Sequence, residues 1–197
     1  IGVDDFKKIM TDNYFYIDKS KFIEEIFNDG AEVKLFTRPR RFGKTLNMSM
    51  LKNFFDIKEA EENRKLFEGL YIKNSPVFAE QGKYPVIFIS MKGIKGTTWE
   101  EMQKSMRKVF SNLYEKHNYL RQYLNERNKR QFEKIWFEEI DGSYDDTLRF
   151  LSEILEGIYN EKVIILIDEY DVPLTTAYEY GFYDKAVAFF KNVYGSV

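Results

Sequence analysis

Two short segments, far apart in the chain, most constrain what this sequence can fold into. The first is an apolar run at residues 31–37, which leads into a loop at 38–45 that ends in Gly-Lys-Thr. The second is a run of five apolar residues at 163–167, followed at once by Asp168 and Glu169. The first pattern predicts a strand at 32–36, a loop, and a helix from about Lys44 to Phe55. The second predicts a strand buried on both faces, with two carboxylates at its C-terminal end.

The Gly-Lys-Thr end of the loop has the chemistry of a phosphate-binding site. Gly43 lets the main chain approach a ligand closely, and a helix N-terminus favours negative charge. Lys44 can neutralise the β- and γ-phosphates, and the Thr45 hydroxyl can bind Mg²⁺. The sequence therefore predicts a P-loop and binding of ATP with Mg²⁺. The predicted nucleotide-binding residues are Arg38, Arg40, Arg41, Phe42, Gly43, Lys44, Thr45 and Leu46.

The loop departs from the usual pattern at its start. The position five residues before the Gly-Lys pair, commonly glycine, is Arg38, and Pro39 follows it. Proline removes one N–H donor and pushes the preceding residue towards extended geometry. Arg38, Arg40 and Arg41 could offset that loss by guanidinium contacts to phosphate. Equally, they could point away from the nucleotide, towards a partner or solvent.

The carboxylates after the second apolar run complete the predicted site. We expect Asp168 to emerge beside Thr45 and to hold Mg²⁺ through water. Glu169 is placed to orient or deprotonate the attacking water, so Lys44 and Glu169 are the predicted catalytic residues. Asp171 has the simpler role of capping a helix whose first turn contains Pro173, and it is left out of the site.

The rest of the chain predicts an α/β fold of the P-loop NTPase type, a parallel sheet flanked by helices. A further strand is expected at 85–90, and a long helical stretch at 98–140 is expected to break near 117–119. Earlier in the chain, Asp18 suits the N-cap of a helix at 19–28. We expect one domain at 1–197, with a helical insertion at about 97–160. The chain ends just after the carboxylate strand, so further strands are expected beyond 197.

Composition excludes several classes of function. The formal net charge of −2 gives no overall field for nucleic acid, and the chain contains no cysteine. Disulfides, thiolate metal sites and a cysteine nucleophile are therefore excluded. No apolar stretch approaches the ~20 residues that a membrane-spanning helix needs. These features favour a cytoplasmic protein that does not enter the membrane.

The sequence resembles a particular family of P-loop proteins. The loop Arg-Pro-Arg-Arg-Phe-Gly-Lys-Thr at 38–45 and the segment Leu-Ile-Asp-Glu-Tyr-Asp-Val-Pro at 166–173 are similar to those of the AAA-ATPase-like family. The segments at 1–6 and 16–20 are also similar to the N-terminal stretch of that family. The resemblance implies that Arg38 in place of glycine is a family trait. It also implies a C-terminal partner domain, since larger members often continue into a restriction-endonuclease-like nuclease domain.

Three functions remain open from the sequence. The first is a Mg²⁺-dependent domain that binds ATP and hydrolyses it slowly or with partners. The second is a regulatory module that binds nucleotide without turnover. The third is a nucleic-acid-binding module that uses the cluster Arg38, Arg40 and Arg41. A P-loop kinase stays open as well, although no acceptor site can be read from the sequence.

Overall fold

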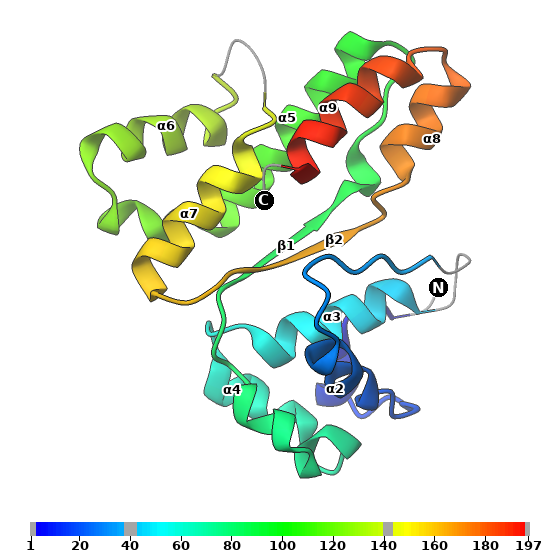
Figure 1. Cartoon of the computed structure of the whole chain (residues 1–197), viewed down its shortest axis with the longest axis vertical. Helices are drawn as coiled ribbons and strands as arrows, with labels where there is room; N and C mark the ends of the chain where they lie inside the picture. Colours follow the sequence, from blue (N-terminus) through cyan, green and yellow to red (C-terminus); the bar gives the residue numbers. More distant parts are fainter. Residues whose placement is uncertain (1–2, 38–42, 140–143, 196–197) are drawn as a thin grey trace. The chain divides into compact units, whose positions relative to one another are not determined.

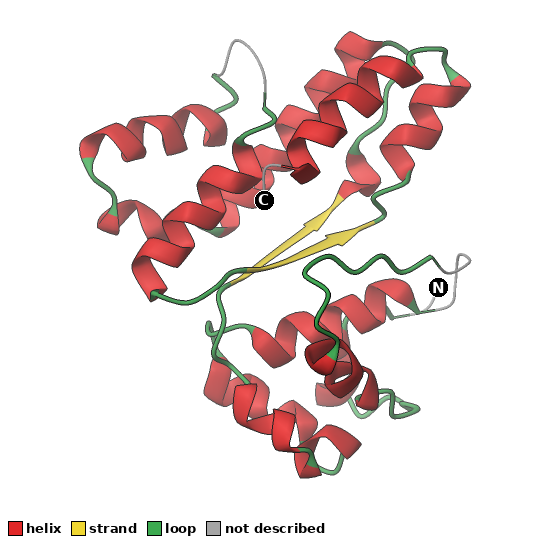
Figure 2. Cartoon of the chain, viewed as in Figure 1, coloured by secondary structure: helices red, strands yellow, loops and turns green. Residues whose placement is uncertain are grey.

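A computed structural model describes residues 3–37, 43–139 and 144–195 of the chain (Figure 1). The described residues form a mixed α/β structure that is mostly helical and contains one two-stranded sheet (Figure 2). The chain divides into two compact units, Ile1–Val86 and Ile87–Val197. The predicted mixture of helices and parallel strands is therefore confirmed. The fuller P-loop NTPase sheet stays a prediction.

The first unit is built from helices. Its elements are α1 (Phe6–Thr11), α2 (Lys21–Asn28), α3 (Lys44–Phe55), α4 (Ala60–Arg64) and three short 3-10 turns at Lys65–Phe67, Tyr71–Asn74 and Pro76–Glu80. Helix α3 has the bounds that its apolar spacing predicts. Its buried side chains include Met50 and Phe54, neither of which is exposed to solvent. Because the rings of Phe54 and Phe67 meet edge to face at 5.2 Å, α3 is anchored to the segment that follows α4.

The strand expected at 32–36 is absent, so this prediction is wrong. Residues 34–37 have no regular structure, although Phe36 packs edge to face on Phe22 of α2 with centroids 5.1 Å apart. Val33 is 86% exposed and Leu35 is 66% exposed. A strand requires a hydrogen-bonded neighbour, and this segment has none among the described residues. The apolar composition of the segment favours an extended backbone, but it does not determine whether a neighbouring strand is present to pair with it.

The start of α2 also differs from expectation. The N-cap position belongs to Ser20, so the prediction for Asp18 is wrong. The Asp18 carboxylate instead accepts hydrogen bonds from the Ser20 N–H at 2.8 Å and from the Tyr71 N–H at 2.7 Å. The Ser20 hydroxyl, fully buried, accepts from the Ile72 N–H at 3.1 Å. Asp18 is used to join two distant segments, which local spacing does not reveal.

The second unit contains the sheet and the larger helices. Its elements are β1 (Val86–Ser90, which begins at the unit boundary), α5 (Trp99–Lys116), α6 (Glu126–Trp136), α7 (Thr147–Tyr159), β2 (Ile164–Asp168), α8 (Val172–Glu179) and α9 (Tyr183–Gly195), with 3-10 turns at Met91–Gly93 and Asn118–Tyr123. Strands β1 and β2 are hydrogen-bonded neighbours and run in the same direction (Figure 2). The predicted strands at 85–90 and 163–167 are thus confirmed. No described helix is long and apolar enough to cross a membrane.

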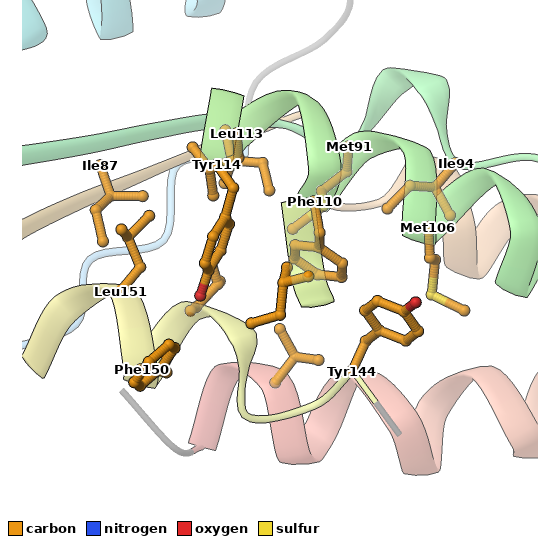
Figure 3. Packing of buried hydrophobic residues seen from close by; sticks show 14 of the residues in the cluster. Ile87, Met91, Ile94, Met106, Phe110, Leu113, Tyr114, Tyr144, Phe150 and Leu151 are labelled. Carbon is orange, nitrogen blue, oxygen red and sulfur yellow. The ribbon is translucent and has the colours of Figure 1, made fainter. Parts of the chain in front are cut away.

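Helix α5 is the centre of the core of this unit (Figure 3). Phe110 and Tyr114 of α5 are fully buried, and the Phe110 ring stacks on Tyr144 at 6.3 Å. The Tyr114 hydroxyl donates a 2.8 Å hydrogen bond to the carbonyl of Thr147, the first residue of α7. Burial of the Tyr114 ring raises the pKa of its hydroxyl, which stays protonated and can donate.

The described residues between the two strands include three α-helices, α5, α6 and α7, and their role as an insertion stays a prediction. Helix α5 ends at Lys116, and the turn at Asn118–Tyr123 separates it from α6, so the predicted break near 117–119 is confirmed. The Ser111 hydroxyl of α5 donates to the Trp136 carbonyl at the end of α6, at 2.6 Å. Helix α7 then leads into β2, the strand that carries the predicted carboxylates.

Candidate functional site

The first half of the candidate site is the N-terminus of α3. Gly43 occupies the N-cap position with φ 73° and ψ 23°, in the left-handed region that favours glycine. Lys44, Thr45 and Leu46 form the first turn, and the first helical hydrogen bond runs from the Asn47 N–H to the Gly43 carbonyl at 2.9 Å. The N–H groups of a first turn have no acceptor within the helix and point towards whatever precedes it. This is the backbone geometry that an anion requires.

Charge at this end of α3 also favours an anion. The first turn contains Lys44 and no acidic residue. The helix dipole adds partial positive charge at the same place. A second ammonium lies close by, because a Cβ atom added at Gly43 would be 3.7 Å from Nζ of Lys19. The predicted residues Arg38, Arg40, Arg41 and Phe42 lie outside the described residues.

Helix α3 is held firmly along the rest of its length. The Phe6 N–H donates to the Ser49 hydroxyl at 3.0 Å, and the Tyr16 hydroxyl contacts the Met50 sulfur at 3.2 Å. Phe6 and Met50 are both fully buried. The N-terminal turn therefore rests on a fixed helix, as a binding site requires.

The second half of the candidate site is the turn after β2. Asp168 is the last residue of the strand and is only 5% exposed. Glu169 follows with φ 55°, in the left-handed region, and its carbonyl accepts from the Val172 N–H at 3.1 Å. A glutamate in this conformation costs about 1 kcal/mol in backbone strain. Such strain is common where a side chain must be held in a particular direction for function.

Asp171 behaves differently from its predicted role. It stands at the N-cap position of α8, with Pro173 in the first turn, but its side chain makes no capping hydrogen bond. Its Oδ1 atom is buried and has no hydrogen-bond partner among the described residues. The buried hydroxyl of Tyr194, on α9, is also without a partner there. Burial raises the pKa of Tyr194, and the nearby charge of Asp171 raises it further.

Asp171, two residues after Glu169, is therefore a polar residue with a buried oxygen atom, and it was left out of the predicted site. Its position at a helix start, before Pro173, predicted a capping role, so its carboxylate was not considered as part of the site. The structure shows that the Asp171 Oδ1 atom is buried, close to Tyr194 of α9, and accepts no hydrogen bond from the described residues. No local signal in the sequence reports that proximity.

The donor atoms suit Mg²⁺, which prefers oxygen ligands and keeps several waters and phosphate oxygens of its own. Thr45 offers a hydroxyl on the first turn of α3, and Asp168 offers a buried carboxylate at the end of β2. Within the described residues, no three His, Cys, Asp or Glu residues cluster as a metal site. The two expected ligands belong to different units of the chain, so their convergence on one ion stays a prediction.

Comparisons with known proteins found a matching family and a similar curated protein. The sequence profile of a family described as Predicted AAA-ATPase matches residues 1–197. A protein of Azotobacter chroococcum mcd 1, described as "Uncharacterized protein in vnfD 5'region", is 35% identical over 94 residues. That match covers 47% of this chain and 17% of the relative, so this chain spans a small part of it. No solved structure matches the chain significantly. Since the family profile extends over the whole sequence, including the Gly-Lys-Thr helix start and the carboxylate strand, the chain belongs to the AAA-ATPase-like family.

Proposed function

We propose that this chain binds ATP with Mg²⁺ and hydrolyses it. The observation that carries the proposal is the left-handed Gly43 that opens α3 directly before Lys44 and Thr45. Family membership supports nucleotide use, because the whole chain matches a family of predicted ATPases. The amides of the first turn and the Lys44 ammonium would bind the phosphate oxygens.

In the proposed reaction, the γ-phosphoryl group is transferred to water. Glu169 accepts a proton from the water as its oxygen forms a bond to the γ-phosphorus. The bond from the γ-phosphorus to the bridging oxygen breaks, and its electron pair leaves with ADP. Thr45 and Asp168 would hold Mg²⁺, which supplies positive charge to the phosphate oxygens when bound. Lys44 stabilises the charge that develops during transfer.

The strain at Glu169 supports its role in this scheme. A glycine would adopt the left-handed conformation without cost, so the carboxylate is present in spite of the backbone. Asp168, directly before it, is buried and therefore firmly placed. The pair offers one carboxylate for the metal and a second for the water.

Binding and turnover can be tested separately. We expect Lys44→Ala to abolish the heat of ATP binding in calorimetry with Mg²⁺. The matched control is Lys52→Ala, since Lys52 lies in the last turn of the same helix. Loss of binding in both variants, or in neither, would contradict the proposed role of Lys44.

Turnover is tested with Glu169→Gln. A general base contributes about 10²–10⁴ to the rate, so phosphate release should fall by at least about a hundredfold while ATP still binds. If ATP binds and phosphate release is the same in both proteins, the non-hydrolysing regulatory module is the correct alternative. If the wild-type chain shows no binding of ATP with Mg²⁺, the proposed function is wrong.

A further inference from the structure

We propose that Lys19 is a second phosphate-binding lysine of this site, contributed by the segment before α2. The inference rests on the proposed function, because it assigns a further residue to the same nucleotide. It follows from the position of the Lys19 ammonium beside Gly43, within the first unit of the chain. Nothing in the Gly-Lys-Thr pattern itself points to this lysine.

The ammonium of Lys19 lies at the entrance to the first turn of α3. A Cβ atom built on Gly43 would be 3.7 Å from Nζ of Lys19, which is an ordinary contact distance. Gly43 immediately precedes Lys44, so the ammonium reaches the end of the helix where first-turn N–H groups lack helical acceptors. A phosphate bound there would be within reach of a lysine from a different part of the chain.

The backbone around Lys19 is fixed by its neighbours. Asp18 accepts hydrogen bonds from the N–H groups of Ser20 and Tyr71, and the buried Ser20 hydroxyl accepts from Ile72. The Lys19 N–H itself donates to the Tyr16 hydroxyl at 3.4 Å. These contacts join the segment to the 3-10 turn at Tyr71–Asn74. Hydrogen bonds therefore hold the backbone from which the Lys19 side chain extends towards the start of α3.

The positive charges around the Lys19 ammonium favour binding of an anion at the N-terminus of α3. An ammonium beside the positive end of a helix is unfavourable, since cations prefer the C-terminal end. Lys44 adds like charge, and the first turn contains no acidic residue to offset it. Lys19 forms no ion pair with any described carboxylate, whereas its neighbour Lys21 pairs with Glu25 at 3.9 Å. A polyphosphate between the two lysines would turn this repulsion into attraction.

The chemistry of lysine suits the role. An ammonium group has three N–H donors and no acceptor, so it can contact several phosphate oxygens at once. The flexible side chain of lysine lets the ammonium keep contact with phosphate oxygens when the triphosphate becomes a diphosphate. The ligand class is therefore the polyphosphate of a nucleoside di- or triphosphate.

The test compares Lys19→Ala with Lys21→Ala in the whole chain. Calorimetry would measure ATP and ADP affinity in the presence of Mg²⁺. We expect Lys19→Ala to weaken binding of ATP by about ten- to a hundredfold, since it removes hydrogen bonds to a charged group. Lys21→Ala, which removes an exposed ion pair, should change affinity by less than about twofold. Lys19→Arg keeps the charge and should restore part of the loss.

Two further measurements separate a binding role from a structural one. The melting temperature without nucleotide should not fall in Lys19→Ala, because the ammonium is repelled by its surroundings until phosphate binds, while the rise on adding ATP should shrink. Amine-reactive labelling followed by mass spectrometry should show ATP protecting Lys19 and leaving Lys21 unprotected. If Lys19→Ala binds ATP as wild type does while Lys44→Ala has lost binding, the role of Lys19 is overturned and the proposed function stands. If wild type binds no ATP, both fail together.

Discussion

Asp56, at the C-terminal end of α3, provides a quantitative test of burial in the first unit. Its Oδ1 accepts a 3.0 Å hydrogen bond from the Lys58 N–H, and its backbone pairs with Tyr84 in an isolated parallel bridge. Burial raises the pKa of the Asp56 carboxyl from its usual value near 3.8 to about 6. The Lys58 N–H and the charges of Lys52 and Lys58 oppose this rise, and Glu59 adds to it.

The sign of the effect follows from proton binding. Because the pKa is higher in the folded state, the folded chain holds this proton between about pH 4 and pH 6, where the unfolded chain has lost it. Stability therefore falls as pH rises through that window, and the whole penalty is present above pH 6. A shift of roughly two units corresponds to about 3 kcal/mol, which screening of this half-buried group reduces to about 2 kcal/mol.

We therefore expect Asp56→Asn to stabilise the protein by about 2 kcal/mol at pH 8 and to leave its stability nearly unchanged at pH 4. Asparagine keeps the acceptor for the Lys58 N–H and cannot ionise. The free energy of unfolding would be measured by urea titration at both pH values. The matched control is Asp29→Asn, since Asp29 follows α2 as Asp56 follows α3 and accepts from the N–H two residues on, but is exposed. An equal gain at pH 4 and pH 8 in Asp56→Asn would refute the reasoning.

Three other substitutions test separate features by urea titration. Tyr114→Phe should lower stability by about 1–2 kcal/mol, because the buried Thr147 carbonyl loses its donor; Tyr123→Phe, at an exposed ring, is the control, and equal losses would count against the claim. Glu169→Gly should raise stability by about 1 kcal/mol by relieving the left-handed strain, while turnover is lost; a decrease in stability would contradict the assigned strain. Gly43→Ala should cost about 1 kcal/mol for the same reason and also weaken ATP binding; unchanged values would exclude a constrained Gly43.

Elements with two agreeing signals were predictable from the sequence. Helix α3 combines a glycine before its start with apolar residues at helical spacing, and its predicted bounds are confirmed. Strand β2 combines a purely apolar run with polar residues that end it. In both cases the information is local, since neighbouring residues determine where such an element begins and ends.

Features that depend on distant segments were not predictable. The run at 31–37 has strand composition, yet a strand exists only when another segment supplies its hydrogen bonds. Asp18 was expected to cap α2 and instead binds the Tyr71 N–H, many residues away. The approach of Lys19 to Gly43 and the unpartnered Oδ1 of Asp171 are likewise set by tertiary packing. The motif residues of the candidate site can thus be predicted from the sequence, whereas its other residues depend on which segments the fold brings together.

The parallel pairing of β1 with β2 has a consequence for how the chain folds. The two strands are joined through α5, α6 and α7, so a long loop must close before they gain their hydrogen bonds. Helices form from local contacts within microseconds, whereas pairing of distant strands is slow. Asp168 ends β2 and Glu169 follows it, so we expect both to become ordered only after the two strands have paired. We expect a nascent or partly denatured chain to keep much of its helix content while the turn with Asp168 and Glu169 is not yet formed.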